Sequence, residues 1–296
     1  MKFHASHLSY CTNIHPAETW AETFAVLRTH VLAVRDRLRA AGSLGADEPF
    51  AIGLRLSAVA ARELLAGGNL AEFTDWLAET NTYVFTINGF PYGSFHGTRV
   101  KEQVFKPDWT ERARVDYTKD LFKILAAIAR PGTGASVSTL PGSHKTFAAD
   151  EPAILQHLIE LAGWLEILAA ETGHDFHLGL EPEPLGHFEN TAETLAFFER
   201  LHAAAPDPKV IRRRIGVNYD ACHFALEYDT ARASLDALTA AGIRISKIHL
   251  SSALALDPRE ATALAAIRAF DEPVYFHQVL LRNSDGEITR FSDLPA

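Results

Sequence analysis

The chain has 296 residues, of which 47% are hydrophobic and 22% are charged, and these ordinary globular proportions exclude disordered, collagen-like and coiled-coil classes. Lys and Arg number 28 and Asp and Glu 37, so the net charge of −9 argues against a protein that binds the phosphate backbone of nucleic acids. Two cysteines, Cys11 and Cys222, are too few for a disulfide framework and suit a reducing cytoplasm. The polar amino terminus does not resemble a signal peptide, and no apolar run approaches the ~20 residues of a membrane span. We therefore expect a cytoplasmic protein without membrane insertion.

Short apolar segments alternate with amphipathic segments along the chain. The segments that predict strands are residues 2–10, 50–57, 82–90, 135–140, 175–181, 214–220, 244–250 and 273–282. Strand–helix alternation over this length predicts a (β/α)8 TIM barrel. An open doubly wound sheet is the alternative, but no Gly-x-Gly-x-x-Gly motif follows a strand. No linker or composition break divides the chain, so we expect residues 1–296 to form a single domain.

Alternate residues of a barrel strand face the helices and the lumen, so the strand pattern predicts which side chains meet at the mouth. Glu181, Asp220 and His249 fall on the polar face, at or near the carboxyl ends of three consecutive strands, where barrel enzymes hold their active sites. Two carboxylates and one imidazole form a ligand set for one divalent metal ion, and ligand type alone leaves Mn²⁺, Mg²⁺, Co²⁺ and Zn²⁺ open. A helix cap or a salt-bridge partner is the alternative role for each residue taken alone.

Other polar residues near the strand ends are candidates for binding a substrate. They are Asn13, His15, Asn88, His96, Glu183 and Lys247. Asn13 or His15 could instead cap the following helix, and Glu183 could be a solvated rim charge. We interpret both cysteines as small, reduced, buried residues rather than nucleophiles, because the sequence shows no base arranged for either.

Three sequence motifs together resemble the xylose isomerase-like TIM barrels, a superfamily of sugar isomerases, 3-epimerases and endonuclease IV. They are the strand-end Glu of LGLEPEP, the Asp-x-x-His of YDACH and the His of KIHLSS. The resemblance covers the whole chain in its strand–helix rhythm and is most specific between residues 176 and 253. In the epimerase branch the Asp binds the metal and the His contacts the substrate, which implies these roles for Asp220 and His223. That branch also has a Glu on strand eight that is both ligand and base, and no Glu sits in a matching strand here.

Within this superfamily, several segments resemble the metabolite-traffic proteins called EboE. They are HLSYCTNIHP, FTINGFPYGSFHG, SVSTLPGSHK, KIHLSSAL and VYFHQV. Members of that group are tied by gene neighbourhood to the export of secondary metabolites or isoprenoid-type precursors. The resemblance implies a part in metabolite traffic.

These patterns favour a divalent-metal-dependent isomerase or epimerase-like enzyme that acts on a sugar, a polyol or a related hydroxycarbonyl metabolite by enediolate-type proton transfer. Glu181 would be both metal ligand and general base. The alternative is a non-catalytic or carrier-type metabolite-binding barrel, which the missing Glu on strand eight favours. A metal-dependent hydrolase is disfavoured because His4 and His7 fall on opposite faces of the first segment, and the net charge disfavours a DNA-repair endonuclease. We expect a small-molecule partner and no nucleic acid, and we leave open a homodimer.

Residues 273–291 contain two β-rich runs around Asn-Ser-Asp-Gly, which predicts a β-hairpin near the barrel mouth or rim rather than a parallel eighth strand. The resemblance to the EboE-type proteins points the same way, because those proteins continue past this hairpin to another strand. We therefore expect a shortened chain with an incomplete eighth unit. His277 is then a candidate fourth metal ligand, with a hydrogen-bonded hairpin histidine as the alternative.

Overall fold

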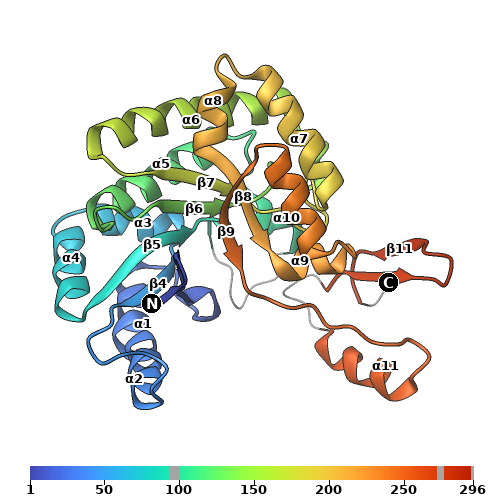
Figure 1. Ribbon diagram of the computed structural model, residues 1–296, viewed down its shortest axis with the longest axis horizontal. Helices are drawn as coiled ribbons and strands as arrows, with labels where there is room; N and C mark the ends of the chain where they lie inside the picture. The colour runs from blue at the N-terminus through green and yellow to red at the C-terminus, as the bar shows by residue number, and fades with distance from the viewer. Residues whose placement is uncertain (94–100, 272–276, 295–296) are drawn as a thin grey trace.

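Seven parallel strands form the central sheet of the protein (Figure 1). The computed structural model describes residues 1–93, 101–271 and 277–294. In spatial order the sheet contains β3 (Tyr10–Cys11), β4 (Phe50–Arg55), β5 (Thr82–Asn88), β6 (Ala135–Thr139), β7 (Phe176–Leu180), β8 (Ile215–Asp220) and β9 (Arg244–His249). Each neighbouring pair is parallel, and the spatial order follows the chain without a reversal. This order is that of a barrel wall and differs from that of a doubly wound sheet.

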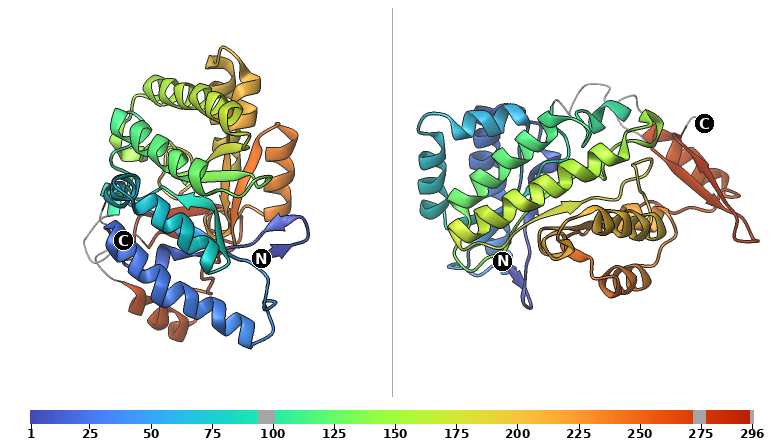
Figure 2. Two further views of the ribbon diagram at one scale, coloured as in Figure 1. Left: turned by 90° about the vertical axis from the view of Figure 1, so that its left-hand side faces the viewer. Right: turned by 90° about the horizontal axis from the view of Figure 1, so that it is seen from above.

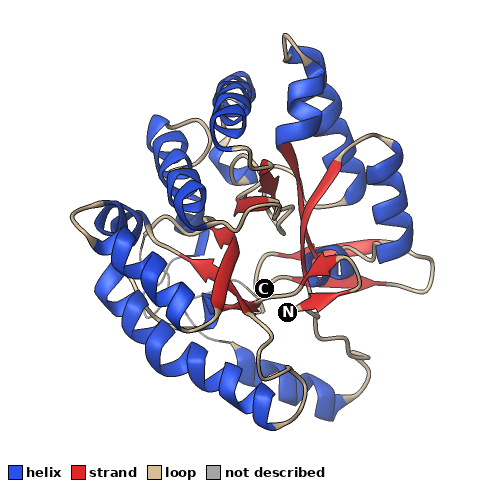
Figure 3. Cartoon of the chain, turned by 60° about the vertical axis from the view of Figure 1, so that its left-hand side comes forward, coloured by secondary structure: helices blue, strands red, loops and turns tan. Residues whose placement is uncertain are grey.

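The helices cover the outside of the curled sheet (Figure 3). They are α1 (Trp20–Val26), α2 (Leu32–Ala40), α3 (Ala58–Leu65), α4 (Asn69–Glu79), α5 (Arg112–Ile128), α6 (Glu151–Thr172), α7 (Thr191–Ala204), α8 (Pro208–Arg214), α9 (Ala221–Leu226), α10 (Ala231–Ala240) and α11 (Ala261–Ile267). A π-helical segment, Leu27–Val31, joins α1 to α2, and short 3-10 helices occur at Thr12–Ile14, Lys101–Phe105, Lys145–Phe147 and Arg268–Phe270. The fold class is therefore α/β with a TIM-barrel-like arrangement, as the alternation predicted.

The hydrophobic core lies between the outer face of the sheet and the helices. Phe176, Leu178 and Leu180 of β7 are fully buried in it. Helix α6 lies beside α5 (Figure 2) and is the helix in the described part of the chain that is long and apolar enough to cross a membrane by length and composition. Its residues Ile154 and Leu158 are fully buried within the same core. Packing on the barrel therefore accounts for the apolar face of α6.

The amino terminus departs from the predicted strand over residues 2–10. β1 (Lys2–Phe3) and β2 (Ser6–His7) pair with each other as a small antiparallel hairpin outside the barrel sheet. The chain reverses at His4, which has a φ of 52°, and of this segment only Tyr10, followed by Cys11, pairs with β4. The prediction was wrong because residues 2–6 remain exposed and do not bury their side chains against the helices, as a barrel strand would.

The carboxyl-terminal hairpin is confirmed for the described residues. β10 (Val279–Arg282) pairs antiparallel with β11 (Ile288–Phe291), whereas residues 273–276 lie outside the described residues. The Asn283 side chain shapes the turn by accepting hydrogen bonds from the backbone N–H groups of Asp285 and Glu287, at 3.0 and 2.9 Å. The hydroxyl of Tyr228 donates to the Leu280 carbonyl at 2.9 Å, which fastens the hairpin beside α9 at the mouth of the barrel.

The barrel wall is open on one side within the described ranges. There, β9 pairs with β8 alone, and no eighth strand joins it to β3. Helix α11, which follows β9, stands apart from the sheet (Figure 1) and contains no buried residue. Within the described residues, the sheet of the predicted (β/α)8 barrel therefore has seven strands, in keeping with the expected incomplete eighth unit.

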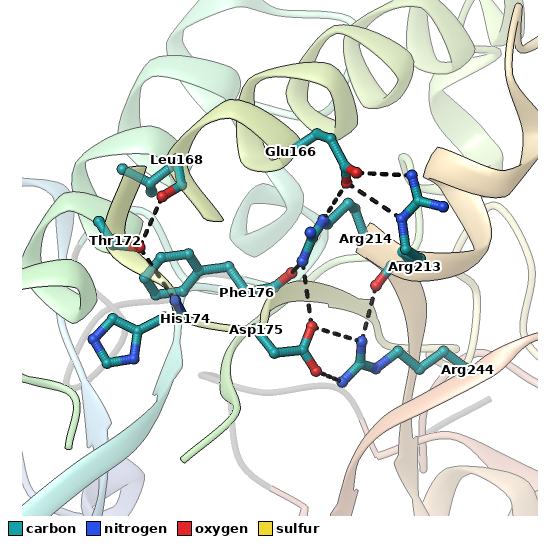
Figure 4. Close-up of polar contacts among 9 residues, drawn as sticks. All are labelled: Glu166, Leu168, Thr172, His174, Asp175, Phe176, Arg213, Arg214 and Arg244. Carbon is teal, nitrogen blue, oxygen red and sulfur yellow. Dashed lines mark hydrogen bonds and ion pairs between the residues drawn. The ribbon is translucent and has the colours of Figure 1, made fainter. Parts of the chain in front are cut away.

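Ion pairs tie the elements together at the amino-terminal ends of the strands, which is the end away from the mouth (Figure 4). Asp175, just before β7, pairs with Arg244 at the start of β9 at 2.5 Å and with Arg214 at the end of α8 at 3.2 Å. Glu166 of α6 pairs with Arg214 at 2.6 Å and with Arg213 at 2.7 Å. Exposed pairs stabilise a fold weakly one by one, but this network links α6, β7, α8 and β9 in one arrangement.

Candidate metal centre

Three side chains converge where β7, β8 and β9 end. His249 Nδ1 lies 3.0 Å from Asp220 Oδ2 and 3.4 Å from Glu181 Oε1, and all three groups are largely buried. Ligand atoms about 2.0–2.3 Å from one ion lie about 3–3.7 Å from each other in octahedral or tetrahedral geometry. The separations therefore fit one divalent ion held by the three residues that the strand pattern selected.

Burial and close approach set the charges of these groups. Burial alone would raise the pKa of Asp220, but the hydrogen bond from His249 and the charge of His223 hold it well below its ordinary value. Glu181 is affected in the same way: the attraction of His249 outweighs burial and lowers its pKa. Burial lowers the pKa of His249, yet the carboxylates of Glu181 and Asp220 raise it overall. Both carboxylates are consequently ionised at neutral pH, as metal ligation requires.

Asn218 supports the centre from two residues before Asp220 on the same face of β8. Its side chain is fully buried, and its Nδ2 donates to Glu181 Oε2 at 2.7 Å and lies 3.3 Å from His249 Nδ1. Gly179 of β7 makes room for it, since a Cβ at that position would lie 3.2 Å from the Asn218 Cβ. Strand parity placed Asn218 on the lumen face but gave it no role. The sequence signal for Asn218 was an amide residue two positions before the carboxylate of Asp220, on the same face of the strand.

His223 lies beside the three donors, on the first turns of α9. Its Nδ1 is 2.9 Å from the Pro182 carbonyl and 3.9 Å from Glu181 Oε1, and its Nε2 is 3.6 Å from Glu183 Oε2. A carbonyl only accepts hydrogen bonds, so Nδ1 carries the hydrogen and Nε2 is the nitrogen left to meet a ligand. Burial raises the pKa of Glu183 to about 7, and although burial lowers the pKa of His223, the charge of Glu183 raises it well above the ordinary value.

A pocket of about 200 Å³ opens next to this cluster. Its lining in the described part of the chain consists of Asn13, Arg55, Asn88, Phe90, Pro91, Val104, Glu181, Glu183 and His223. The predicted substrate-binding residues Asn13, Asn88 and Glu183 thus share one pocket with His223. Arg55 was missed, although a charged residue that ends a wholly apolar strand was a usable signal.

The other predicted site residues make different contacts. The ring of His15 is 3.0 Å from the Tyr10 hydroxyl and stacks on His30. Lys247 Nζ donates to Ser138 Oγ at 3.1 Å inside the lumen. His277 lies at the base of the hairpin, where its backbone N–H donates to Asp293 at 3.0 Å, and it does not join the donor cluster among the described residues. His96 lies outside the described residues.

Several solved structures are similar to this chain in their overall arrangement. No family model and no curated protein matches it. A D-tagatose 3-epimerase-like protein is 15% identical over 72% of this chain and 71% of its own, with a TM-score of 0.46. A zinc-bound IolI protein is 13% identical over 74% of this chain and 66% of its own, with a TM-score of 0.45. The 3-keto-D-glucoside 4-epimerase YcjR from E. coli is 14% identical over 88% of this chain and 98% of its own, with a TM-score of 0.43.

This chain spans about two thirds of the length of several such structures. These identities and scores describe a likeness in shape and carry no conclusion about activity, and the resemblance to the EboE-type proteins stays a prediction. The sheet order and curvature show the barrel-type α/β fold (Figure 3), and a further solved structure similar in shape is a xylose isomerase domain protein from Planctomyces limnophilus, which is 16% identical over 71% of this chain and 66% of its own, with a TM-score of 0.44.

Proposed function

We propose that the protein is a divalent-metal-dependent isomerase or epimerase-like enzyme for a sugar, a polyol or a related hydroxycarbonyl metabolite. The observation that carries the proposal is the meeting of two ionised carboxylates and an imidazole, with donor atoms 3.0 and 3.4 Å apart, beside a polar pocket. Among barrel sites, such a ligand set next to hydrogen-bonding amides suits a substrate rich in hydroxyl and carbonyl oxygens.

Each residue of the site has a separate role in this proposal, which follows from its position. A divalent ion held by Glu181, Asp220 and His249 would polarise the substrate carbonyl. Glu181 is ionised, so its carboxylate can accept the proton from the carbon next to that carbonyl. Asn218 holds the second oxygen of Glu181 and so orients the carboxylate. His223 and Glu183 border the pocket, where their polar atoms can hydrogen-bond substrate hydroxyls.

Metal binding is the first test. We expect the purified protein, loaded with Mn²⁺, Co²⁺ or Zn²⁺, to hold one ion per chain by elemental analysis and calorimetry. His249→Ala should weaken binding by at least about 100-fold, because two carboxylates alone cannot complete the coordination. His202→Ala, on α7, is the matched control and should bind as the wild type does. A wild type that binds none of these ions would refute the proposal.

Turnover is the second test. Ketoses, aldoses and polyol-derived ketones are incubated with the metal-loaded protein in deuterated water, and the products are analysed by NMR and mass spectrometry. Deuterium entering a substrate C–H bond would support the proposal, and its loss in a Glu181→Gln variant that still holds the ion by elemental analysis would support proton transfer by Glu181. Tight binding of such a compound without exchange or turnover would instead favour the carrier-type binding barrel.

A further inference from the structure

Arg55 brings a buried guanidinium to the pocket. It is the last residue of β4, its side chain is only 3% exposed, and it lines the same pocket as Glu181 and His223. A buried cation needs a partner, because leaving it without one is costly. The identity of that partner decides whether the pocket attracts anions.

The terminal nitrogens of Arg55 are already engaged within the chain. Nη1 donates to the Ala17 carbonyl at 2.5 Å, Nη2 donates to the Gly93 carbonyl at 3.0 Å, and both nitrogens lie 3.3 Å from Glu18. Arginine binds phosphate and carboxylate groups tightly by presenting two parallel N–H donors. Here Glu18 occupies that position and neutralises the charge, so the guanidinium is a poor anchor for an anionic ligand.

One polar hydrogen of Arg55 and one oxygen of Asn13 remain without partners. Arg55 Nε and Asn13 Oδ1 are both buried, neither has a hydrogen-bond partner in the part of the chain that the structure describes, and both residues line the pocket. A buried donor and a buried acceptor left unpaired at one pocket call for a ligand. A hydroxyl group can satisfy either atom, because its oxygen accepts a hydrogen bond and its hydrogen donates one.

We propose that Arg55, neutralised by Glu18, and Asn13 form a hydroxyl-binding subsite that selects an uncharged polyhydroxy substrate over its phosphate ester. The inference rests on the proposed function for the identity of the reaction, but the choice between neutral and anionic ligands follows from the Arg55–Glu18 pair alone.

Calorimetry with inorganic phosphate, D-fructose and D-fructose 6-phosphate tests the subsite. We expect the wild type to bind D-fructose more tightly than its phosphate ester and to show no binding of inorganic phosphate at about 10 mM. Glu18→Gln frees the positive charge of Arg55, so it should bind inorganic phosphate at least about tenfold more tightly and shift the preference toward the ester. Glu79→Gln on the exposed face of α4 removes an equal charge and should change neither affinity.

Arg55→Lys keeps a cation beside Glu18 but removes the Nε–H donor, so it should weaken D-fructose binding about tenfold and raise KM more than it lowers kcat. A wild type that binds the phosphate ester or inorganic phosphate as tightly as Glu18→Gln does would overturn the inference, as would a Glu18→Gln variant that gains no phosphate affinity. The phosphate titrations need neither metal nor turnover, so their outcome is separate from that of the proposed reaction.

Discussion

At the scale of single residues, the candidate centre depends on an uncharged amide. Asn218 binds the Glu181 oxygen that faces away from His249, and it thereby fixes which oxygen meets the imidazole. A carboxylate that turns freely must be ordered when an ion binds, and that ordering reduces affinity. The same side chain also packs close to His249 Nδ1, at 3.3 Å.

Replacing Asn218 should therefore weaken the centre without removing a ligand. We expect Asn218→Ala to lower Mn²⁺ or Zn²⁺ affinity by about 10- to 100-fold, measured by calorimetry on folded protein. Ser136→Ala breaks a buried lumen hydrogen bond with Thr86 and is the control for a general loss of packing. If both variants lose the same affinity, Asn218 has no specific part in holding Glu181.

His177 is a second informative residue, buried at the amino-terminal part of β7. Burial and the nearby charge of Arg244 lower its pKa to about 3, whereas an unfolded histidine has a pKa near 6.5. Between these pH values the unfolded chain binds a proton that the folded chain does not, so folding is penalised as the pH falls. The contribution of His177 to stability is complete above about pH 6.5 and is lost progressively toward pH 3.

Urea denaturation between pH 7 and pH 4 measures this dependence. We expect the free energy of unfolding to fall more steeply with decreasing pH in the wild type than in His177→Gln, since the variant has no group to protonate there. Equal slopes for the two proteins would show that the imidazole is not held neutral by burial.

At the scale of elements, one arginine joins the carboxyl-terminal hairpin to the barrel. Arg290 of β11 pairs with Glu227 at 2.5 Å, and the Glu227 side chain is only 1% exposed. Arg290 Nε also lies 3.9 Å from Glu189. The hairpin thus pairs with a buried carboxylate directly after α9, the helix that carries His223.

Removing the arginine should leave that carboxylate buried and unpaired. We expect Arg290→Met to lower the free energy of unfolding by about 1–3 kcal/mol and to make the hairpin more susceptible to limited proteolysis. Arg232→Met, which breaks an exposed pair with Asp236, should cost no more than about 0.5 kcal/mol. The double variant Arg290→Met/Glu227→Gln should recover part of the lost free energy of unfolding, because it leaves no buried carboxylate without a partner. If it recovers nothing, the pair does not stabilise the hairpin.

At the scale of the whole molecule, most of the described helices share one core. Buried residues of α1 and of α3 through α10 belong to a single hydrophobic cluster on the outside of the sheet. A chain built this way should unfold cooperatively, because no subset of helices retains a core of its own.

We therefore expect far-ultraviolet circular dichroism and tryptophan fluorescence to report the same urea midpoint. The four tryptophans lie at positions 20, 76, 109 and 164, so fluorescence samples several parts of the barrel. Two separate midpoints would contradict the prediction that residues 1–296 are one domain.

Local patterns determined much of the fold. The alternation of apolar and polar residues in β7, β8 and β9 selected the lumen face and with it Glu181, Asp220 and His249, because strand parity is a property of neighbouring residues. The turn at Asn283–Gly286 likewise specified the hairpin through short-range hydrogen bonds. Such features need no knowledge of distant parts of the chain.

Only the tertiary structure decided the rest. The residue pattern of positions 2–10 predicted one strand. Whether this segment pairs with β4 or folds back as a hairpin depends on whether the rest of the protein buries it, and residues 2–6 are exposed. The roles of Asn218 and Arg55 arise from residues 37 positions away in the chain, Glu181 and Glu18 respectively. Contacts of that separation, and the pKa shifts that follow from burial, are set when the strands come together, so no local pattern carries them.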